Sequence, residues 1–360
     1  MPYRFQNIQA LRAVAASLVL FAHACNFAAG AEPSLASAMW AMRHVGHMGV
    51  DIFFVISGFI MVVVARRGLE NGPSPARVAI DFLRHRAVRI YPLFWITLAV
   101  LLILPAVPGV PHDWMAVLRD PTRLLLLVDP TEDVIAWSLT REIYFYGAVA
   151  LIMLFGPRRF ASAFVIAAIL FVLLLVAKAV TGFGRDVSML DRIALEFIIG
   201  AGIAALIASG VRAGWRTAIV AGVALLAASA ALSPDAILLS GTRFLVWGIP
   251  AGPILYGLVA AEQTNTLLLP AWLRDFGDAS YSLYMWHTPV LILLAALWPA
   301  IGLSGSLVGG VTALVAGNVL SILVARLSYT WIETPLMARG LAKRAGGESV
   351  PAVPAATARS

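Results

Sequence analysis

The chain is dominated by apolar stretches that are long enough to cross a lipid bilayer as helices. Stretches of roughly 17 to 25 such residues recur over its whole length, and a membrane-spanning helix needs about 20. Of its 360 residues, 61% are hydrophobic and 12% are charged, whereas soluble domains average about 25% charged residues. The sequence therefore predicts an all-α fold, a polytopic membrane bundle of about ten helices. The expected spans are 8–28, 45–65, 88–107, 137–155, 160–177, 190–209, 217–232, 237–260, 281–300 and 306–327.

Residues 1–340 are expected to form one membrane domain, followed by a disordered cytoplasmic tail over 341–360 that is rich in Ala and Pro. The first span resembles a secretory signal, because "AAGAE" offers small residues near a cleavage site. A polar His23 late in its apolar core and the further spans favour a retained helix. Cys25 is the only cysteine, so no intramolecular disulfide can form.

The formal charge of +7 comes mostly from arginines in alternate loops. The basic residues follow the second, fourth, sixth and tenth spans, whereas the loop after the third span is acidic. The positive-inside rule therefore places both termini in the cytoplasm. The loops indicate topology signals and contacts with anionic lipids, not nucleic-acid binding. The basic residues are Arg66, Arg67, Arg77, Arg84, Arg86, Arg89, Arg158, Arg159, Arg212, Arg216, Arg339, Lys343 and Arg344, and the acidic ones are Asp113, Asp120, Asp129, Glu132 and Asp133.

This orientation assigns a depth to each polar residue within the spans. A charged group at mid-bilayer costs about 2.5–3.5 kcal/mol on insertion scales, so such groups usually face a partner or an aqueous cavity. The sequence thus predicts a cationic inner mouth and a mixed outer cluster, with Asp51 and Arg192 as candidate substrate-binding residues. The inner residues are Arg12, Arg84, Arg86 and Arg89, and the outer ones are His23, Asp51, Glu142, Asp191, Arg192 and Glu196.

Arg12 and His23 are expected to be two stations along one cleft. Eleven positions separate them, which places them within about 20° on one helix face and roughly 16 Å apart along the axis. Simpler roles are open for both. Arg12 could snorkel to the interface, and His23 could be a neutral ring bonded to a backbone carbonyl.

Other polar residues also have simpler explanations. Arg192 and Glu196 could form an ordinary pair four positions apart on one helix. The arginines between the second and third spans could act only as topology signals. The histidines in or beside loops are expected to be solvated, and these are His44, His47 and His85.

Six stretches together resemble the integral-membrane acyltransferase family 3, whose members O-acylate bacterial surface polysaccharides and related lipids. They occur in the family's order and cover nearly the whole chain. The stretches are "NIQALRAVAASLVLFAHA", "MGVDIFFVISGFIM", "FLRHRAVRIYPLFW", "WSLTREIYFYG", "FGDASYSLYMWHTPVL" and "SYTWIETP".

The resemblance implies roles for several residues. The family's catalytic histidine falls on His23, its paired arginine on Arg12 and its acid on Glu142. Its basic donor-binding motif falls on Arg84, Arg86 and Arg89. Arg141 departs from the pattern, because an uncharged residue is usual there. The tail is too short for an appended esterase-like domain, so none is expected. In this the chain resembles the compact branch of the family that is associated with exopolysaccharide modification.

The resemblance further implies a multi-pass protein of the bacterial inner membrane. Its donor would be cytoplasmic acyl-CoA, most often acetyl-CoA, and its acceptor a polysaccharide or lipid-linked oligosaccharide, with no permanently bound cofactor and no metal. His23 would take the proton from a sugar hydroxyl that attacks the thioester. A transient acyl-His23 intermediate is the competing version. Glu142 is expected within direct or one-water hydrogen-bonding reach of the His23 ring, where it would fix the tautomer.

The alternative function is a secondary transporter or flippase for a sugar or lipid intermediate. Its intramembrane charges would bind and move a substrate, and internal repeats with broken helices in matching positions would favour it. The sequence contains no convincing repeat.

Overall fold

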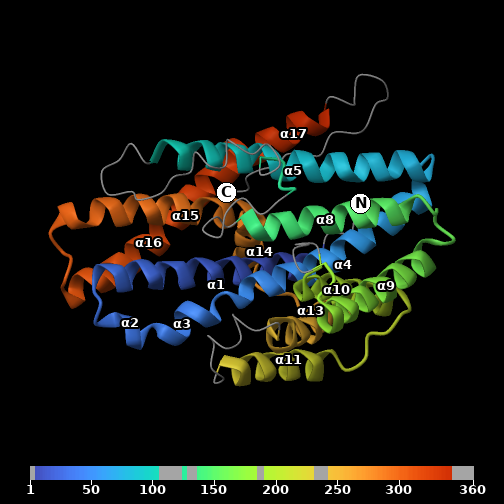
Figure 1. Cartoon of the computed structure of the whole chain (residues 1–360), viewed down its shortest axis with the longest axis horizontal. Coiled ribbons are helices and arrows are strands. Elements are labelled where there is room, and N and C mark those ends of the chain that lie inside the picture. Colours follow the sequence, from blue (N-terminus) through green and yellow to red (C-terminus); the bar gives the residue numbers. More distant parts are fainter. Residues whose placement is uncertain (1–4, 105–123, 128–135, 185–189, 231–241, 343–360) are drawn as a thin grey trace.

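The computed structural model describes residues 5–104, 124–127, 136–184, 190–230 and 242–342. Every regular element in these ranges is a helix, and most long helices run along the longest axis of the molecule (Figure 1). The elements are α1 (Gln6–Ala31), α2 (Leu35–Ala38), α3 (Trp40–Val45), α4 (Met48–Asn71), α5 (Pro75–Ile103), α8 (Ala136–Met153), α9 (Phe160–Thr181), η2 (Arg192–Ala194), α10 (Leu195–Ala208), α11 (Trp215–Ala230), η3 (Phe244–Gly248), α13 (Ile249–Gln263), α14 (Ala271–Asp278), α15 (Ser280–Leu297), η4 (Trp298–Ile301), α16 (Leu307–Ser328), η5 (Tyr329–Glu333) and α17 (Thr334–Ala342).

Each of the ten expected spans overlaps a helix of the described chain. Seven helical stretches in the described ranges are long and apolar enough to cross a membrane, whereas α10 has only 14 residues and α11 only 16. The all-helical prediction is therefore confirmed, while the count of ten and the side on which the termini lie stay predictions. The predicted acidic loop and nearly all of the predicted tail lie outside the described residues.

The third long helix begins much earlier than the expected start at residue 88. The helix α5 starts at Pro75, and the Ser74 hydroxyl accepts a hydrogen bond from the backbone N–H of Arg77 at 3.3 Å. Serine as N-cap followed by proline in the first turn is a strong helix start. The prediction that Arg84 and its neighbours lie in a loop is wrong, because these arginines lie on helix α5.

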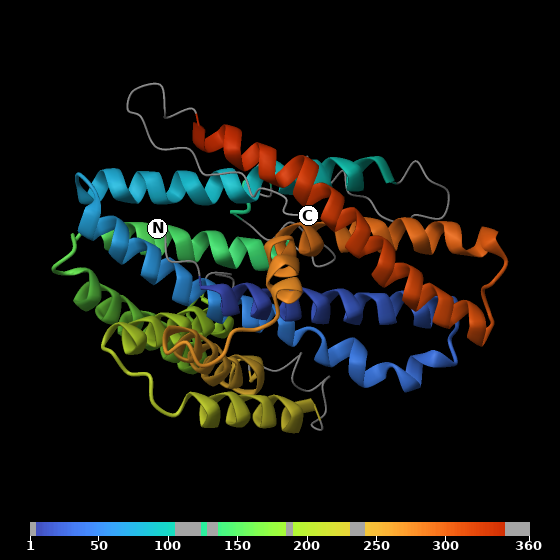
Figure 2. The ribbon, with the colours of Figure 1, turned by 180° about the vertical axis from the view of Figure 1, so that it is seen from behind.

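The helix α1 runs through the middle of the bundle, and α14 packs across it (Figure 2). The beginning of α1 is held by residues that are far away in the sequence. The Glu262 carboxylate accepts hydrogen bonds from the backbone N–H groups of Gln6 and Asn7 at 2.8 and 2.7 Å. The N-terminus of a helix is a favourable place for a negative charge. The Asn7 amide donates to the carbonyl oxygens of Leu258 and Leu267. These bonds fix α1, which carries Arg12 and His23.

Two glycines let α4 and α10 pack backbone to backbone. A Cβ atom on Gly58 would lie 2.1 Å from the carbonyl oxygen of Phe197, and one on Gly200 would lie 2.0 Å from that of Val55. Small residues at helix contacts are the usual way in which membrane helices approach closely. The short helix α10 is therefore part of the packed interior.

The helix α9 lies at the outside of the bundle (Figure 1). Only 6% of its most apolar window is buried, and its exposed side chains are large aliphatic ones, among them Ile166, Leu170 and Leu173. A helix this apolar that is left uncovered by protein fits a lipid environment.

Candidate functional site

A cavity of about 190 Å³ opens between α1, α4, α5, α8 and α15. Its walls combine apolar side chains of α4 with a concentration of polar groups from all five helices. Cationic, acidic and hydroxyl groups therefore meet within the bundle, as expected for a polar cleft in a membrane protein. The polar lining residues are Gln9, Arg12, Ser57, Arg86, Arg89, Ser138, Glu142, Tyr146, Ser280, Tyr281 and Tyr284.

The structure brings three of the four predicted inner arginines to this cavity. Arg86 and Arg89 are three positions apart on α5, so they lie about 60° apart around the helix, and both line the cavity. Arg84 lies about 160° from Arg86 around the same helix and is not among the lining residues. Arg12 lines the same cavity from α1, and its charge interacts with that of Arg89.

Glu142 lies among these cations in the cavity lining. Its carboxylate accepts a hydrogen bond from the Ser57 hydroxyl at 2.6 Å and another from the Tyr146 hydroxyl. Its charge acts on Arg12 and Arg86. No direct hydrogen bond joins Glu142 to His23, although the structure describes both residues, so the predicted direct contact is not formed. The carboxylate is satisfied by hydroxyl donors instead.

A second acid, Glu333, approaches the same arginines from the C-terminal end of the chain. The residue is 3% exposed, and its Oε2 accepts a hydrogen bond from the Ser282 hydroxyl at 2.6 Å. Its negative charge acts on Arg12 and Arg89. Glu333 was not among the predicted site residues, although it lies in the stretch "SYTWIETP" that resembles the family.

His23 belongs to a cluster of three imidazoles at the far end of α1. Its ring centroid lies 5.4 Å from that of His47 and 5.1 Å from that of His287. His47 is partly buried, so its predicted solvated position is wrong, whereas His85 is exposed as predicted. The side chain of His44 lies outside the described part of the structure.

Close packing of α1 against the beginning of α4 forms this cluster. A Cβ atom on Gly46 would lie 2.4 Å from the carbonyl oxygen of Leu18, and one on Gly49 would lie 2.2 Å from that of Ala15. Any larger side chain would separate the two helices. His47, between the two glycines, is thereby pressed towards His23.

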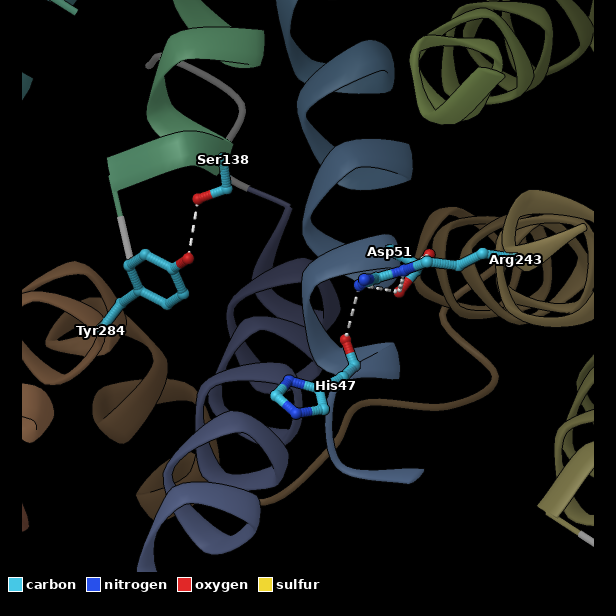
Figure 3. Close-up of polar contacts among 5 residues, drawn as sticks. All are labelled: His47, Asp51, Ser138, Arg243 and Tyr284. Carbon is cyan, nitrogen blue, oxygen red and sulfur yellow. Dashed lines mark hydrogen bonds and ion pairs between the residues drawn. The ribbon is translucent and has the colours of Figure 1, made fainter. Parts of the chain in front are cut away.

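Tyr284 connects the imidazole cluster to the cavity. Its ring centroid lies 5.7 Å from that of His287, and its hydroxyl lies 2.7 Å from the Ser138 hydroxyl on α8 (Figure 3). Both Ser138 and Tyr284 line the cavity, whereas His23 does not. Val50, another lining residue, comes one helical turn after His47. The Tyr284 side chain therefore lies between the end of the cavity and the imidazole cluster.

Asp51, a predicted substrate-binding residue, is fully buried and paired with a cation. The Arg243 guanidinium donates to both Asp51 carboxylate oxygens at 2.8–3.1 Å and to the His47 carbonyl oxygen at 3.1 Å (Figure 3). It also lies over the rings of Trp137 and Trp247, at 5.5 and 5.2 Å from their centroids. Asp51 does not line the cavity, and both of its carboxylate oxygens are engaged by Arg243.

Arg192, the other predicted substrate-binding residue, is exposed and does not line the cavity. The neighbouring cation Arg141 forms an ion pair with Asp191, with 3.5 Å between Nη2 and Oδ2. Arg141, which departs from the family pattern, therefore joins α8 to the segment before η2 through this ion pair. Among the described residues no group of three or more His, Cys, Asp or Glu side chains could hold a metal ion.

Comparison with known proteins identifies the family of the chain. The acyltransferase domain of family 3 matches residues 5–329. The chain is 32% identical over 319 residues to the exopolysaccharide production protein ExoZ of Rhizobium meliloti, covering 83% of this chain and 92% of that protein. It is 26% identical over 322 residues to acyltransferase MdmB of Streptomyces mycarofaciens, covering 80% and 79%. No solved structure matches the chain significantly.

The matched range spans the cavity, the imidazole cluster and all the helices from α1 to α16. The chain therefore belongs to acyltransferase family 3, and it is a membrane O-acyltransferase.

Proposed function

We propose that the protein transfers an acyl group, most often acetyl, from cytoplasmic acyl-CoA to a hydroxyl of an exopolysaccharide or lipid-linked sugar in the bacterial inner membrane. The observation that carries the proposal is one arginine-lined cavity whose far end lies next to an imidazole cluster. The name of the Rhizobium relative, an exopolysaccharide production protein, supports the acceptor class.

The cationic end of the cavity suits the phosphates of an acyl-CoA. Arg86 and Arg89 face the cavity from α5 and Arg12 faces it from α1, and the planar guanidinium group donates paired hydrogen bonds to phosphate. Glu142 and Glu333 partly balance these charges, which limits the repulsion between the arginines while the site is empty. Arg84, on the other side of α5, contributes less to binding.

The length of the site suits the pantetheine arm of the donor. Arg12 and His23 lie roughly 16 Å apart along α1, which is the order of length of that arm. With the phosphates at the arginines, the thioester would reach the end of the cavity at Val50 and Tyr284. The carbonyl carbon would then lie beside the imidazole cluster.

His23 acts as the general base in this proposal. It removes the proton from the acceptor hydroxyl while the hydroxyl oxygen attacks the thioester carbonyl carbon. The tetrahedral intermediate then collapses, the carbon–sulfur bond breaks, and the departing thiolate takes the proton from His23. A neutral imidazole can begin this cycle near pH 7, because the ordinary pKa of histidine is ~6.5. In a second version His23 itself attacks and carries the acyl group transiently.

The function is tested with radiolabelled acetyl-CoA given to membrane vesicles that contain the protein and its polysaccharide acceptor. We expect label in the polysaccharide, removable by mild alkali as an ester, and none when the protein is absent. A transporter or flippase would move the polysaccharide or its lipid precursor without covalent labelling. That outcome would contradict an acyltransferase function for this site.

A further inference from the structure

The inference concerns His287, and it rests on the proposed function of His23. His287 lies on α15 and is completely buried. Its Nδ1 atom lies 3.1 Å from the carbonyl oxygen of Leu283, one turn earlier. A carbonyl oxygen can only accept a hydrogen bond, so Nδ1 carries the proton. The Nε2 atom of the neutral ring is therefore a hydrogen-bond acceptor.

This acceptor has no partner within the described part of the chain. The Nε2 atom of His287 is buried and makes no hydrogen bond there. Buried polar groups in folded proteins are nearly always paired, because an unsatisfied one is costly. A buried acceptor without a partner among the described residues can accept a hydrogen bond from an N–H on a neighbouring ring.

The nearest candidate donor is His23. The two ring centroids lie 5.1 Å apart, with the ring planes inclined at 52°. The ring of His23 takes part in no hydrogen bond with the described residues, so nothing there fixes its tautomer. Glu142, the group predicted for this task, is engaged by Ser57 and Tyr146.

We propose that His287 is a positioning residue that accepts a hydrogen bond from the N–H of the neutral His23 ring and keeps it while His23 becomes an imidazolium. One ring nitrogen of His23 takes the proton of the acceptor hydroxyl, and the N–H on its other ring nitrogen donates to Nε2 of His287. The proton returned to the departing CoA sulfur comes from His23. His287 keeps its own Nδ1 proton throughout, so it gains and loses nothing.

A neutral partner suits this depth of the bundle. A carboxylate would be a buried charge before the reaction begins, whereas a neutral imidazole carries none. The groups that act on His287 are His23 from α1, His47 from the beginning of α4, and Tyr284 on its own helix. In the described ranges, α5, α14 and α16 also pack on α15 and add no titratable group to this set.

Two substitutions separate positioning from packing. His287→Asn keeps an amide near the Nδ1 position but has no atom at Nε2, whereas His287→Gln can place its amide oxygen near Nε2. Turnover and the KM for acetyl-CoA are measured with detergent-solubilised protein over a pH range that brackets ~6.5, the ordinary pKa of histidine. If His287→Asn does not fold, His287→Leu replaces it as the variant without an acceptor.

Loss of the acceptor should make His23 a weaker base. We expect His287→Asn to lower kcat at least about tenfold, to move the acidic limb of the pH profile to lower pH, and to leave the KM unchanged. His287→Gln should restore part of kcat and return the limb towards its original position. These shifts in the pH profile are not expected from a residue that only fills space.

Wild-type kcat in His287→Asn would overturn the inference. A loss of kcat with an unshifted limb and no rescue by Gln would also overturn it, since that pattern indicates packing alone. Failure of the proposed function looks different: His23→Ala would then retain transfer, whatever the result at His287.

Discussion

The guanidinium of Arg243 binds the Asp51 carboxylate and the carbonyl oxygen of His47 at the same time. Its Nε lies 2.9 Å from Oδ1 of Asp51, and one terminal nitrogen lies 2.8 Å from Oδ2 and 3.1 Å from the His47 oxygen. The contact joins residues 192 positions apart. It therefore ties the beginning of α4, where His47 faces His23, to the segment that leads into η3.

Removal of this cation should strongly destabilise the protein. Arg243→Gln would leave the fully buried Asp51 carboxylate without its counter-charge, a change that typically costs about 3–5 kcal/mol. The double substitution with Asp51→Asn should recover part of the loss, because the Asp51 charge is then removed together with its partner. Thermal unfolding of the detergent-solubilised protein measures both, with the exposed Arg158→Gln as control. Equal unfolding temperatures for Arg243→Gln and Arg158→Gln would contradict the structural role.

The cavity arginines should control the affinity for the donor. Arg86→Gln and Arg89→Gln each remove a charged donor of the kind that contributes about 1.5–3 kcal/mol, so each should weaken acetyl-CoA binding roughly tenfold to a hundredfold. Arg77→Gln is the matched control, because Arg77 lies on the same helix, is 57% exposed and pairs with Asp81. Titration of the purified variants with acetyl-CoA gives the affinities. If all three bind it equally well, the basic residues of α5 serve topology and not the donor.

Gly49 should be intolerant of even one methyl group. A Cβ atom there would lie 2.2 Å from the carbonyl oxygen of Ala15, so Gly49→Ala must separate α1 from α4 and move His47 away from His23. We expect a loss of about 1–3 kcal/mol in stability together with reduced transfer. Gly30→Ala is the control, because Gly30 lies on α1 with nothing within 4 Å of the added carbon. Similar behaviour of the two variants would mean that the helices are not packed this tightly.

The distribution of basic residues predicts the orientation in the membrane. A reporter fused after Arg344 should lie in the cytoplasm, and one inserted near Asp129 should lie outside. Protease protection and an enzyme reporter that is active on only one side of the membrane give independent answers. The reverse pattern would put the arginine cavity on the side where acyl-CoA is absent, and the proposed route of the donor would fail.

The helices were predictable because hydrophobic length is written directly in the sequence. Each expected span overlaps a helix, but α5 begins at Pro75, well before the apolar part that marks its membrane crossing. Hydropathy registers the apolar part of a helix, whereas the N-cap formed by Ser74 decides where the helix begins. The capping signal of Ser74 followed by Pro75 predicts that the arginines lie on a helix.

The site was only partly predictable, because depth along a helix follows from sequence and contacts between distant helices do not. The joint position of Arg12, Arg86, Arg89 and Glu142 in one cavity agrees with the expectation of a polar cleft. The direct partners of Glu142 were not predicted, since the fold brings Ser57 and Tyr146 to its carboxylate. A water-mediated contact with His23 stays a prediction.

The partners missed in the sequence had visible signals. Arg243 is a lone cation in an expected span, and the buried Asp51 needs such a partner. His287 lies in the stretch "FGDASYSLYMWHTPVL" that resembles the family, as an ionisable residue within an expected span. An ionisable residue inside a span is a site candidate wherever it occurs.

The most direct test of the central claim is the rate of acyl transfer by His23→Ala from radiolabelled acetyl-CoA to the polysaccharide, in folded and correctly inserted protein. The exposed His85→Ala serves as the matched histidine control. General-base catalysis by His23 predicts a loss of at least about a hundredfold in turnover, with unchanged binding of acetyl-CoA and near-wild-type transfer by His85→Ala. Near-wild-type transfer by His23→Ala would contradict the account.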